Sequence, residues 1–284
     1  MTAVLGGRVR ATATPRRRSG GFLVGAVTQL ATLAGAVAVW EIVTRGLDQV
    51  YFPPPSTIVA AMHEAWLSGP AGHLFLNDQA TTGLSSSLGR LLFGWACAAV
   101  FGVVAGVALG RSPKAAQYLD PVLQLGRAMP APTLIPLFIV VFHVGASMEI
   151  ATIIFGVVWP IVLNAMDGAR SVDRLQIDMA AVFGVTGVRR LTHVIVPGAA
   201  PKIFAGLRTS VSLSLILMVM AELLGSGNGI GAQLVNAQRE FEIPRMWGGI
   251  VILGILGYVL NALFQAVERW CLGWHRGVRQ SGSS

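Results

Sequence analysis

The residue types that carry out chemistry in enzymes are present in this sequence, but their spacing assembles no familiar reactive group. The five histidines occur singly, with no HExxH or similar pattern that would indicate a metal ligand set or a general base. They are His63, His73, His143, His193 and His275. Cys97 and Cys271 lie far apart in apolar surroundings, and neither has a CxxC or Cys/His partner. We therefore expect no catalytic residues and no metal site in this chain.

Nucleotide chemistry is also not expected within the chain. The phosphate-binding pattern GxxxxGK followed by Ser or Thr does not occur. The glycine-rich run from Gly225 to Gly231 could be mistaken for a nucleotide loop, but it follows an apolar segment instead of a strand. We interpret this run as an external turn, and we expect no ATP, magnesium or other cofactor to be bound by this polypeptide itself.

A few polar residues lie inside long apolar runs and are candidates for contact with a transported solute. A charged residue at the centre of a membrane span costs about 2.5 to 3.5 kcal/mol on insertion scales, so each such residue needs an explanation. Arg127 precedes a proline-rich break, where its guanidinium could bind an oxyanion or could instead extend to the nearer membrane surface. Glu222 is either a structural ion pair or helix cap, or a ligand to the solute.

Three uncharged polar residues complete the candidate substrate path. Ser210 and Ser214 share one face of any helix that contains them, and Asn164 lies in the preceding apolar run. Hydroxyl groups at such positions can bind a ligand, bond back to their own helix, or simply allow close helix packing. We list Arg127, Asn164, Ser210, Ser214 and Glu222 as path residues and keep the packing alternative open.

The elements that must hold these residues are membrane-spanning helices. Apolar residues make up 54% of the 284 residues and charged residues only 12%, which is about half the charge content of a soluble domain. Six apolar runs approach the roughly 20 residues that a spanning helix needs. They cover residues 22–44, 84–109, 122–142, 149–166, 204–224 and 247–269. Because unpaired backbone groups are costly in lipid, these runs predict an all-α integral membrane protein.

The distribution of Lys and Arg predicts the orientation of the chain in a cell (inner or plasma) membrane. The formal net charge is +8, but the basic residues alternate between successive connections and do not form a nucleic-acid-binding patch. Residues 1–21 hold five arginines, residues 45–83 hold only one, and the connection 167–203 again holds five basic residues. We expect both termini to be cytoplasmic, with a disordered basic tail at 1–21 and a second tail at 271–284.

Prolines mark two irregular segments. Phe52 is followed by three prolines and Ser56, which predict the start of a short helix capped by Ser56, and Ile58, Val59, Met62 and Trp66 then recur at helical spacing. We interpret this helix as lying at the membrane interface, within an external loop. The first span and this loop together form the region 22–83. Pro130, Pro132 and Pro136 predict that the third span is kinked or locally unwound.

The cytoplasmic connection 167–203 is long and only partly polar, so we expect it to fold. Asp173 can cap a first short helix, Gly184 and Gly187 allow a turn, and a second helix then runs to Pro197, where we expect a break before the fifth span. Two short helices hinged at glycine would project from the membrane as a compact knob.

The same connection resembles the signature of permease subunits of ABC importers, which reads EAA, three residues, Gly, nine residues, then IxLP. Asp178 stands at the Glu position, Met179 and Ala180 at the alanines and Gly184 at the glycine, while Val194, Val196 and Pro197 match the closing motif. The spacing is kept throughout and the residues in part. Further segments, such as Ala221-Glu222-Leu223-Leu224-Gly225, are similar to the nitrate, sulfonate and taurine branch over roughly residues 53–274.

The resemblance implies a type I ABC importer transmembrane domain, with a permease core at 84–270 and a cytoplasmic coupling helix in the connection 167–203. It also implies partners: a second permease copy, two ATPase subunits that bind ATP and magnesium, and an external or periplasmic binding protein. The expected solute is a small oxyanion such as nitrate, a sulfonate or taurine, or a small organic compound. The alternative that stays open is a secondary transporter or channel that works alone; an enzyme is not expected.

Overall fold

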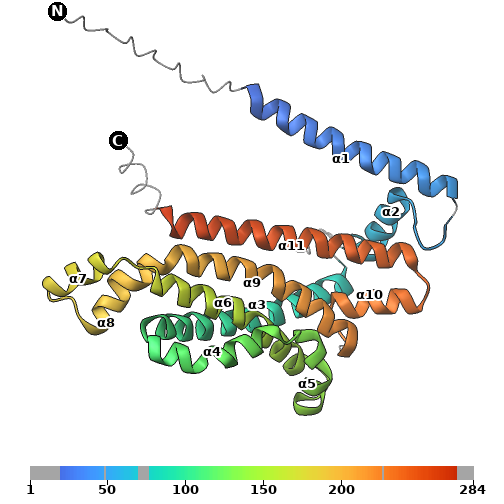
Figure 1. The fold of residues 1–284 in the computed structure, drawn as a ribbon. Helices are drawn as coiled ribbons and strands as arrows, with labels where there is room; N and C mark the ends of the chain where they lie inside the picture. The colour runs from blue at the N-terminus through green and yellow to red at the C-terminus, as the bar shows by residue number, and fades with distance from the viewer. Residues whose placement is uncertain (1–19, 48, 70–76, 226, 274–284) are drawn as a thin grey trace, which may run out of the picture. The chain divides into compact units, whose positions relative to one another are not determined.

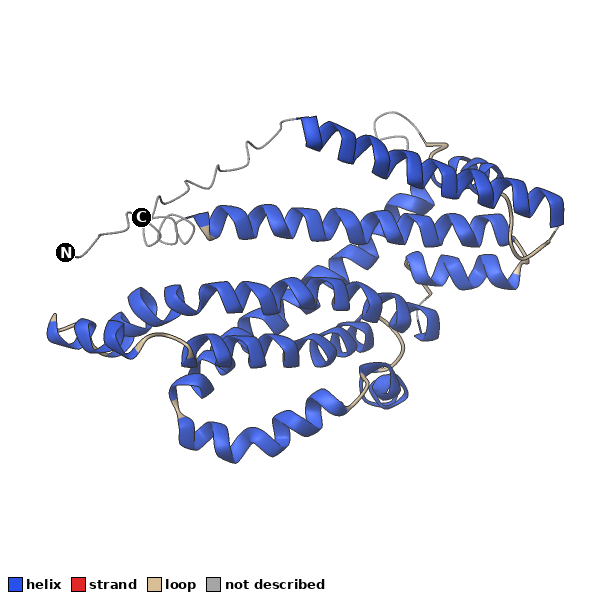
Figure 2. Ribbon diagram, turned by 45° about the horizontal axis from the view of Figure 1, so that its top comes forward, coloured by secondary structure: helices blue, strands red, loops and turns tan. Residues whose placement is uncertain are grey.

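The computed structural model describes residues 20–47, 49–69, 77–225 and 227–273, and every regular element in these ranges is a helix (Figure 1, Figure 2). The helices are α1 Gly20–Leu47, α2 Pro55–Trp66, α3 Asp78–Arg111, α4 Pro113–Ala128, α5 Ile135–Phe142, α6 Ala146–Arg170, α7 Arg174–Val182, α8 Gly187–Arg190, α9 Val196–Gly225, α10 Ile230–Arg239 and α11 Ile243–Cys271. A 3₁₀ helix, Ala131–Leu134, precedes α5, and a π-helical segment, Leu191–Ile195, joins α8 to α9.

Five of the six predicted spans are confirmed within the described residues by length and composition. Five helical stretches are long and apolar enough to cross a membrane: 27–47, α3, α6, the continuous helix 187–225 and α11. The predicted third span falls on the pair formed by α4 and the segment 131–142, which is bent by 87° at the prolines and has the geometry of a broken span or a re-entrant loop. The kink predicted for the third span is therefore confirmed, because Pro130, Pro132 and Pro136 replace regular α-helix by one 3₁₀ turn.

The boundaries of the third helix differ from the predicted span. α3 begins at Asp78, six residues before the apolar run, so the predicted division between residues 83 and 84 falls inside a helix. Asn77 starts it by accepting a hydrogen bond from the Ala80 amide at 2.7 Å. The first two turns are polar, and a search for apolar runs does not detect them. The predicted tails at 1–21 and 271–284 fall almost wholly outside the described residues.

The chain divides into two compact units, residues 1–56 and residues 57–284. In the first unit, Glu41 of α1 accepts hydrogen bonds from the amide and the hydroxyl of Ser56, at 3.0 and 2.7 Å. α2 begins one residue before Ser56, which therefore lies in the first turn and is not the predicted cap. Glu41 supplies the capping carboxylate instead, and Arg45 pairs with it at 2.6 Å.

The apolar face of α2 packs in part on protein, and the predicted position of this helix at the membrane interface stays a prediction. Ile58 and Trp66 are buried, and Trp66 packs with Ala80 and Ile230. Val59, which the helical spacing placed on the same face, is 60% exposed.

In the second unit, α3, α6 and α9 run side by side and enclose the main core (Figure 1). The largest buried side chains between them include Leu91, Ile153, Val157, Ile161, Leu217 and Met218. α7 and α8 project from one end of these helices, and α10 lies at the other end (Figure 1). We call these the α7–α8 end and the α10 end.

Glycines at the surface of α3 set its distance from α6. A side chain at Gly102 would meet Ile161, one at Gly106 would meet the Val162 carbonyl, and one at Gly110 would lie 2.6 Å from the Met166 carbonyl. Small residues at such positions allow helix backbones to approach closely, which is a main source of helix association in lipid. The α3–α6 contact therefore depends on residues with no side chain.

We expect Gly106→Val to lower the stability of the folded protein by about 2 to 3 kcal/mol, because the new side chain overpacks a contact with backbone that cannot move away. The measurement is thermal unfolding of the purified protein in detergent. Gly89→Val on the same helix is the control, since nothing lies within 4 Å of its added carbon. Equal unfolding temperatures for the two variants would contradict the close α3–α6 contact.

Candidate functional site

The knob predicted in the connection 167–203 is formed by α7, α8 and the first residues after them. The boundaries differ, because α6 continues to Arg170 and leaves only residues 171–173 before α7. Asp173 caps α7 as predicted, by accepting a hydrogen bond from the Leu175 amide at 3.0 Å. Asp178 and Met179 lie on the exposed side of α7, and Ala180 faces inward with 8% of its surface exposed.

Gly184 ends α7 with a glycine-dependent cap. Its φ of 71° lies in the left-handed region, which side chains disfavour. The Gly184 amide donates to the Ala181 carbonyl at 3.0 Å, and the Val185 amide donates to the Ala180 carbonyl at 2.8 Å. This pair of bonds is the Schellman motif, with Gly184 as the residue just beyond the helix. The motif turns the chain from α7 toward α8.

The break predicted at Pro197 is wrong. The helix is continuous from Gly187 to Gly225, and the five residues before Val196 adopt a π-helical turn. A proline inside a helix has no amide to donate, and its ring clashes with the carbonyl four residues earlier. A wider turn relieves that crowding and lets the helix continue. Val194, Val196 and Pro197 are half-buried where the knob joins α9.

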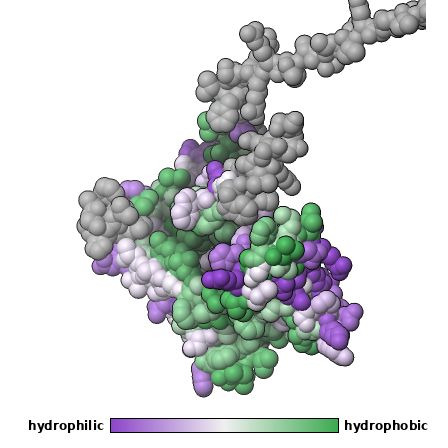
Figure 3. Space-filling model, turned by 90° about the vertical axis from the view of Figure 1, so that its left-hand side faces the viewer, coloured by the Kyte–Doolittle hydropathy of each residue, from purple (hydrophilic) through white to green (hydrophobic). Residues whose placement is uncertain are grey.

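Large apolar side chains are exposed on the knob, next to basic ones. They are Leu175 at 64%, Met179 at 51%, Val182 at 84%, Phe183 at 79% and Val188 at 74% exposed. Arg174, Arg189 and Arg190 lie on the same short helices. Figure 3 looks onto this end of the molecule and shows hydrophobic residues lying among hydrophilic ones. Such a mixture suits a protein interface better than the interior of a bilayer.

The candidate path residues do not form one group. Arg127 is exposed near the end of α4, next to the bend, and makes no hydrogen bond or ion pair with any described residue. Its neighbour Gly126 packs against the ring of Trp159 on α6, so close that a side chain there would overlap the ring. The side of α4 that carries Gly126 therefore faces α6, and Arg127 lies on a side that does not.

The uncharged candidates are involved in internal packing. Ser210 and Ser214 are fully buried, and their hydroxyls bond back to the carbonyls of Leu207 and Val211, each at 2.7 Å. Ser210 also accepts a hydrogen bond from the indole of Trp95 at 2.8 Å. Asn164 donates to the Pro160 carbonyl at 2.8 Å. These contacts fit the packing alternative, and a role of these residues in the path stays a prediction.

Glu222 belongs to a buried charge cluster at the α10 end. Arg90 of α3 lies between two carboxylates: its Nε is 2.7 Å from Glu149 of α6, and its Nη2 is 2.7 Å from Glu222 of α9. Both carboxylates are essentially unexposed, and the arginine side chain is 13% exposed. Ser87 donates to Glu222 at 2.6 Å. Of the alternatives considered for Glu222, these contacts agree with the structural ion pair.

The sequence interpretation missed Arg90 and Glu149, although a signal was available. Arg90 lies inside the predicted span 84–109, where a charge requires a partner. Glu149 was taken only as the start of the next span. If every charge in an apolar run is treated as one partner of an ion pair, both residues become candidates. Within the described part of the chain, no three His, Cys, Asp or Glu side chains gather as a metal site.

Comparison with known proteins relates this geometry to transport. The taurine transport system permease protein TauC of Escherichia coli is 29% identical over 88% of this chain and 90% of its own length. The putative aliphatic sulfonates transport permease protein SsuC of Bacillus subtilis is 31% identical over 92% and 90%. The nitrate import permease protein NrtB of Synechococcus elongatus is 28% identical over 82% and 85%.

Solved structures show the same fold. An inward-facing MetNI methionine ABC transporter matches with a TM-score of 0.59 at 18% identity, over 66% of this chain and 94% of that chain. Residues 98–272, more than half of the chain, match the family described as binding-protein-dependent transport system inner membrane component. The predicted type I ABC importer transmembrane fold is thus confirmed, and the chain belongs to the family of membrane-spanning permease subunits of ABC importers.

Proposed function

We propose that this permease subunit imports a small oxyanion, either a sulfonate such as taurine or nitrate, as one of two identical copies that share a path. Two ATPase subunits bind the α7–α8 ends and supply ATP and magnesium, and an external binding protein delivers the anion to the α10 end. The taurine, sulfonate and nitrate permeases among the relatives support this solute class. Closed two-fold pairing is the common arrangement for identical subunits.

The observation that carries this proposal is the exposed apolar surface of the knob. Met179, Val182 and Phe183 are 51%, 84% and 79% exposed on a short helix whose far side packs against the protein. Apolar surface on such a knob is costly in water unless another protein covers it. ATP-driven closure of two ATPases that grip this surface would move α6 and α9 as rigid bodies, because α7 and α8 connect these two helices directly.

The orientation follows from charge. The α7–α8 end carries Arg170, Arg174, Arg189, Arg190 and Lys202, whereas the turn between α10 and α11 balances Arg239 and Arg245 with Glu240 and Glu242. Lys and Arg are enriched on the cytoplasmic side of membrane proteins. The α7–α8 end and both termini are therefore cytoplasmic in this proposal.

The orientation predicts that a cysteine at position 174 is protected from outside. In a background with Cys97→Ala and Cys271→Ala, Arg174→Cys should react with a membrane-impermeant maleimide only after the cells are opened. Asn236→Cys on the exposed side of α10 is the matched control and should react in intact cells. Labelling of position 174 in intact cells would reverse the topology and remove the ATPase from the knob.

The cap of α7 gives a test of coupling. Gly184→Val forces a branched side chain into left-handed backbone, which costs about 1 to 3 kcal/mol locally, and should release α7 from its position. We expect normal membrane insertion, loss of ATPase co-purification, and uptake reduced at least about tenfold. Gly184→Asn is the control, because Asn tolerates this backbone region. Parental uptake by the Val variant would show that the knob is not the coupling element.

Arg127 gives a test of the solute class, since an exposed guanidinium without a partner can pair with an oxyanion. We expect Arg127→Gln to lower taurine or nitrate uptake about tenfold, the loss of roughly one charge-assisted hydrogen bond, and Arg127→Lys to retain part of it. Gln124→Ala, also exposed on α4, is the control. Unchanged transport by Arg127→Gln would exclude this side chain from the path.

A further inference from the structure

The charge cluster at Arg90 does more than join three spanning helices. The same guanidinium donates to the Asn228 carbonyl at 2.8 Å, in the turn that leads from α9 into α10. Glu222 accepts a hydrogen bond from the Gly231 amide at 2.7 Å, and the Ser87 hydroxyl accepts one from the Ile230 amide at 3.0 Å. The cluster therefore holds both the turn and the first backbone amides of α10.

The glycines of this turn allow the carboxylate to come so close. A side chain at Gly229 would overlap the carboxylate of Glu222, and one at Gly231 would lie 2.7 Å from its Cβ. Gly229 also has a φ of 133°, which side chains disfavour. The carboxylate thus lies at the N-terminal end of α10, where amides and the helix dipole favour a negative charge. The position of α10 is fixed from beneath by side chains of α3 and α9.

α10 differs from the long helices in what it exposes. At ten residues it is about 15 Å long, half the thickness of the bilayer core. Its inner side buries Ile230, Gly231, Ala232 and Ala237, while Asn236, Gln238 and Arg239 are exposed. A helix with hydrogen-bonding groups on its outer side is suited to contact a water-soluble partner.

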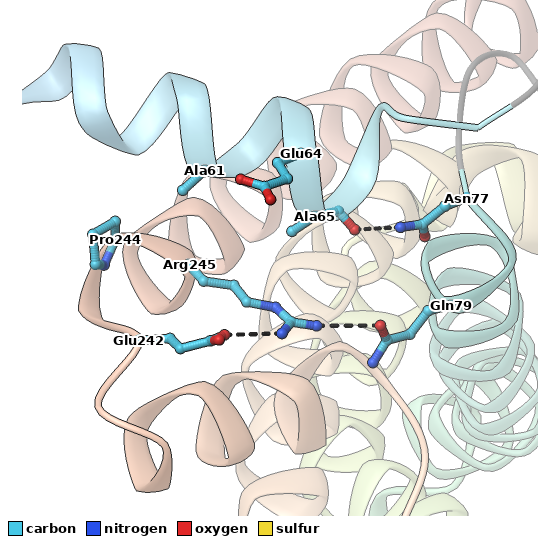
Figure 4. A pocket seen from close by; sticks show the side chains of 8 residues that line it. All are labelled: Ala61, Glu64, Ala65, Asn77, Gln79, Glu242, Pro244 and Arg245. Carbon is cyan, nitrogen blue, oxygen red and sulfur yellow. Dashed lines mark hydrogen bonds and ion pairs between the residues drawn. The ribbon is translucent and has the colours of Figure 1, made fainter.

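The surface around α10 is hollowed. A cavity of about 350 Å³ lies between the first turns of α3 and the residues Gln233 and Asn236 of α10. A second cavity of about 460 Å³ lies at the start of α11, and Figure 4 shows Arg245 there, held between Glu242 and Gln79. Polar recesses of this size can receive side chains of a docking protein.

We propose that Arg90 is a positioning residue for delivery of the solute: it holds α10 in the orientation that the external binding protein recognises, and it passes the force of docking to α3, α6 and α9. This inference rests on the proposed function, because it needs an external partner. The partner surface is a polar protein surface that hydrogen-bonds to the exposed side of α10. Since the cluster contacts all three core helices, a displacement of α10 on docking is transmitted to α3, α6 and α9.

The test uses the complete transporter in lipid nanodiscs, with ATP hydrolysis measured against increasing concentrations of its external binding protein. That protein is loaded with taurine or nitrate, whichever the parent transports. The main variant is Arg90→Gln with Glu149→Gln, which keeps the formal charge of the cluster at −1, since one positive and two negative charges become one negative charge. This avoids leaving two buried carboxylates without a counter-charge.

We expect the double variant to retain its ATPase subunits and its basal hydrolysis, and to need about tenfold more binding protein for half-maximal stimulation. Arg90→Lys keeps the positive charge without the forked donors and should recover part of the loss. Arg208→Gln is the control, because Arg208 loses a pair with Glu268 away from the α10 end. An unchanged half-maximal concentration in the double variant would overturn the proposal.

A second variant keeps the proposal testable if the double variant does not assemble. Asn236→Ala with Arg239→Ala removes exposed groups of α10 and leaves the cluster intact. It should also raise the half-maximal concentration, at unchanged thermal stability, and an unchanged concentration would overturn the proposal. If the parent transporter holds no ATPase and its hydrolysis responds to no binding protein, the proposed function itself fails. If the parent and its variants respond to the binding protein at the same concentration, only the role of Arg90 and α10 fails.

Discussion

The close contact between α3 and α6 is the constraint on which the rest of this structure depends. In lipid, helices gain little from hiding apolar surface, because lipid tails are equally apolar, so they associate through close packing. Gly102, Gly106 and Gly110 bring α3 against the backbone of α6. On its other side, α6 receives α9 in the same way, since a side chain at Gly206 would meet Asn164 and the Pro160 carbonyl. The three helices therefore form one closely packed unit.

The two ends of this unit are built for different work. At the α7–α8 end, α7 is capped by backbone hydrogen bonds at Gly184 and leaves apolar side chains uncovered. At the α10 end, a buried cluster of ion pairs and hydrogen bonds holds the start of a polar helix. An apolar surface on a well-defined helix favours a stable interface, whereas a polar surface suits a partner that binds transiently. A rigid unit between these ends can pass a displacement from one to the other, because packed helices do not absorb it.

The sequence predicted the parts of this fold that depend on local chemistry. Six apolar runs, the proline kink before α5, the Asp173 cap and the turn at Gly184 all follow from properties of neighbouring residues, and the structure contains each of them. Parts that depend on distant partners were not predicted. Glu41 caps the helix that begins near Ser56, and Arg90 pairs with carboxylates more than fifty positions away. The π turn that carries the helix through Pro197 is local, but the spacing of the residues does not distinguish it from a break. A charge in an apolar run indicates that a partner exists, but the sequence does not say which distant residue supplies it.

Arg90 and Arg127, two of the arginines that lie in predicted spans, show how burial and partners separate structure from transport. Arg90 is almost covered, and its guanidinium pairs with two carboxylates and donates to a carbonyl of this same chain. Arg127 is exposed beside the bend of α4 and has no partner among the described residues. A charge that faced lipid at the centre of a span would cost about 2.5 to 3.5 kcal/mol on insertion scales. The packing of Gly126 on Trp159 fixes how α4 is rotated, so the chain cannot turn Arg127 inward to avoid that cost. Two arrangements avoid that cost: the guanidinium extends to the nearer membrane surface, or, with two copies paired as proposed, the side of α4 that carries Arg127 lines water between them. The second arrangement is the one in which an anion reaches Arg127, and it stays a prediction.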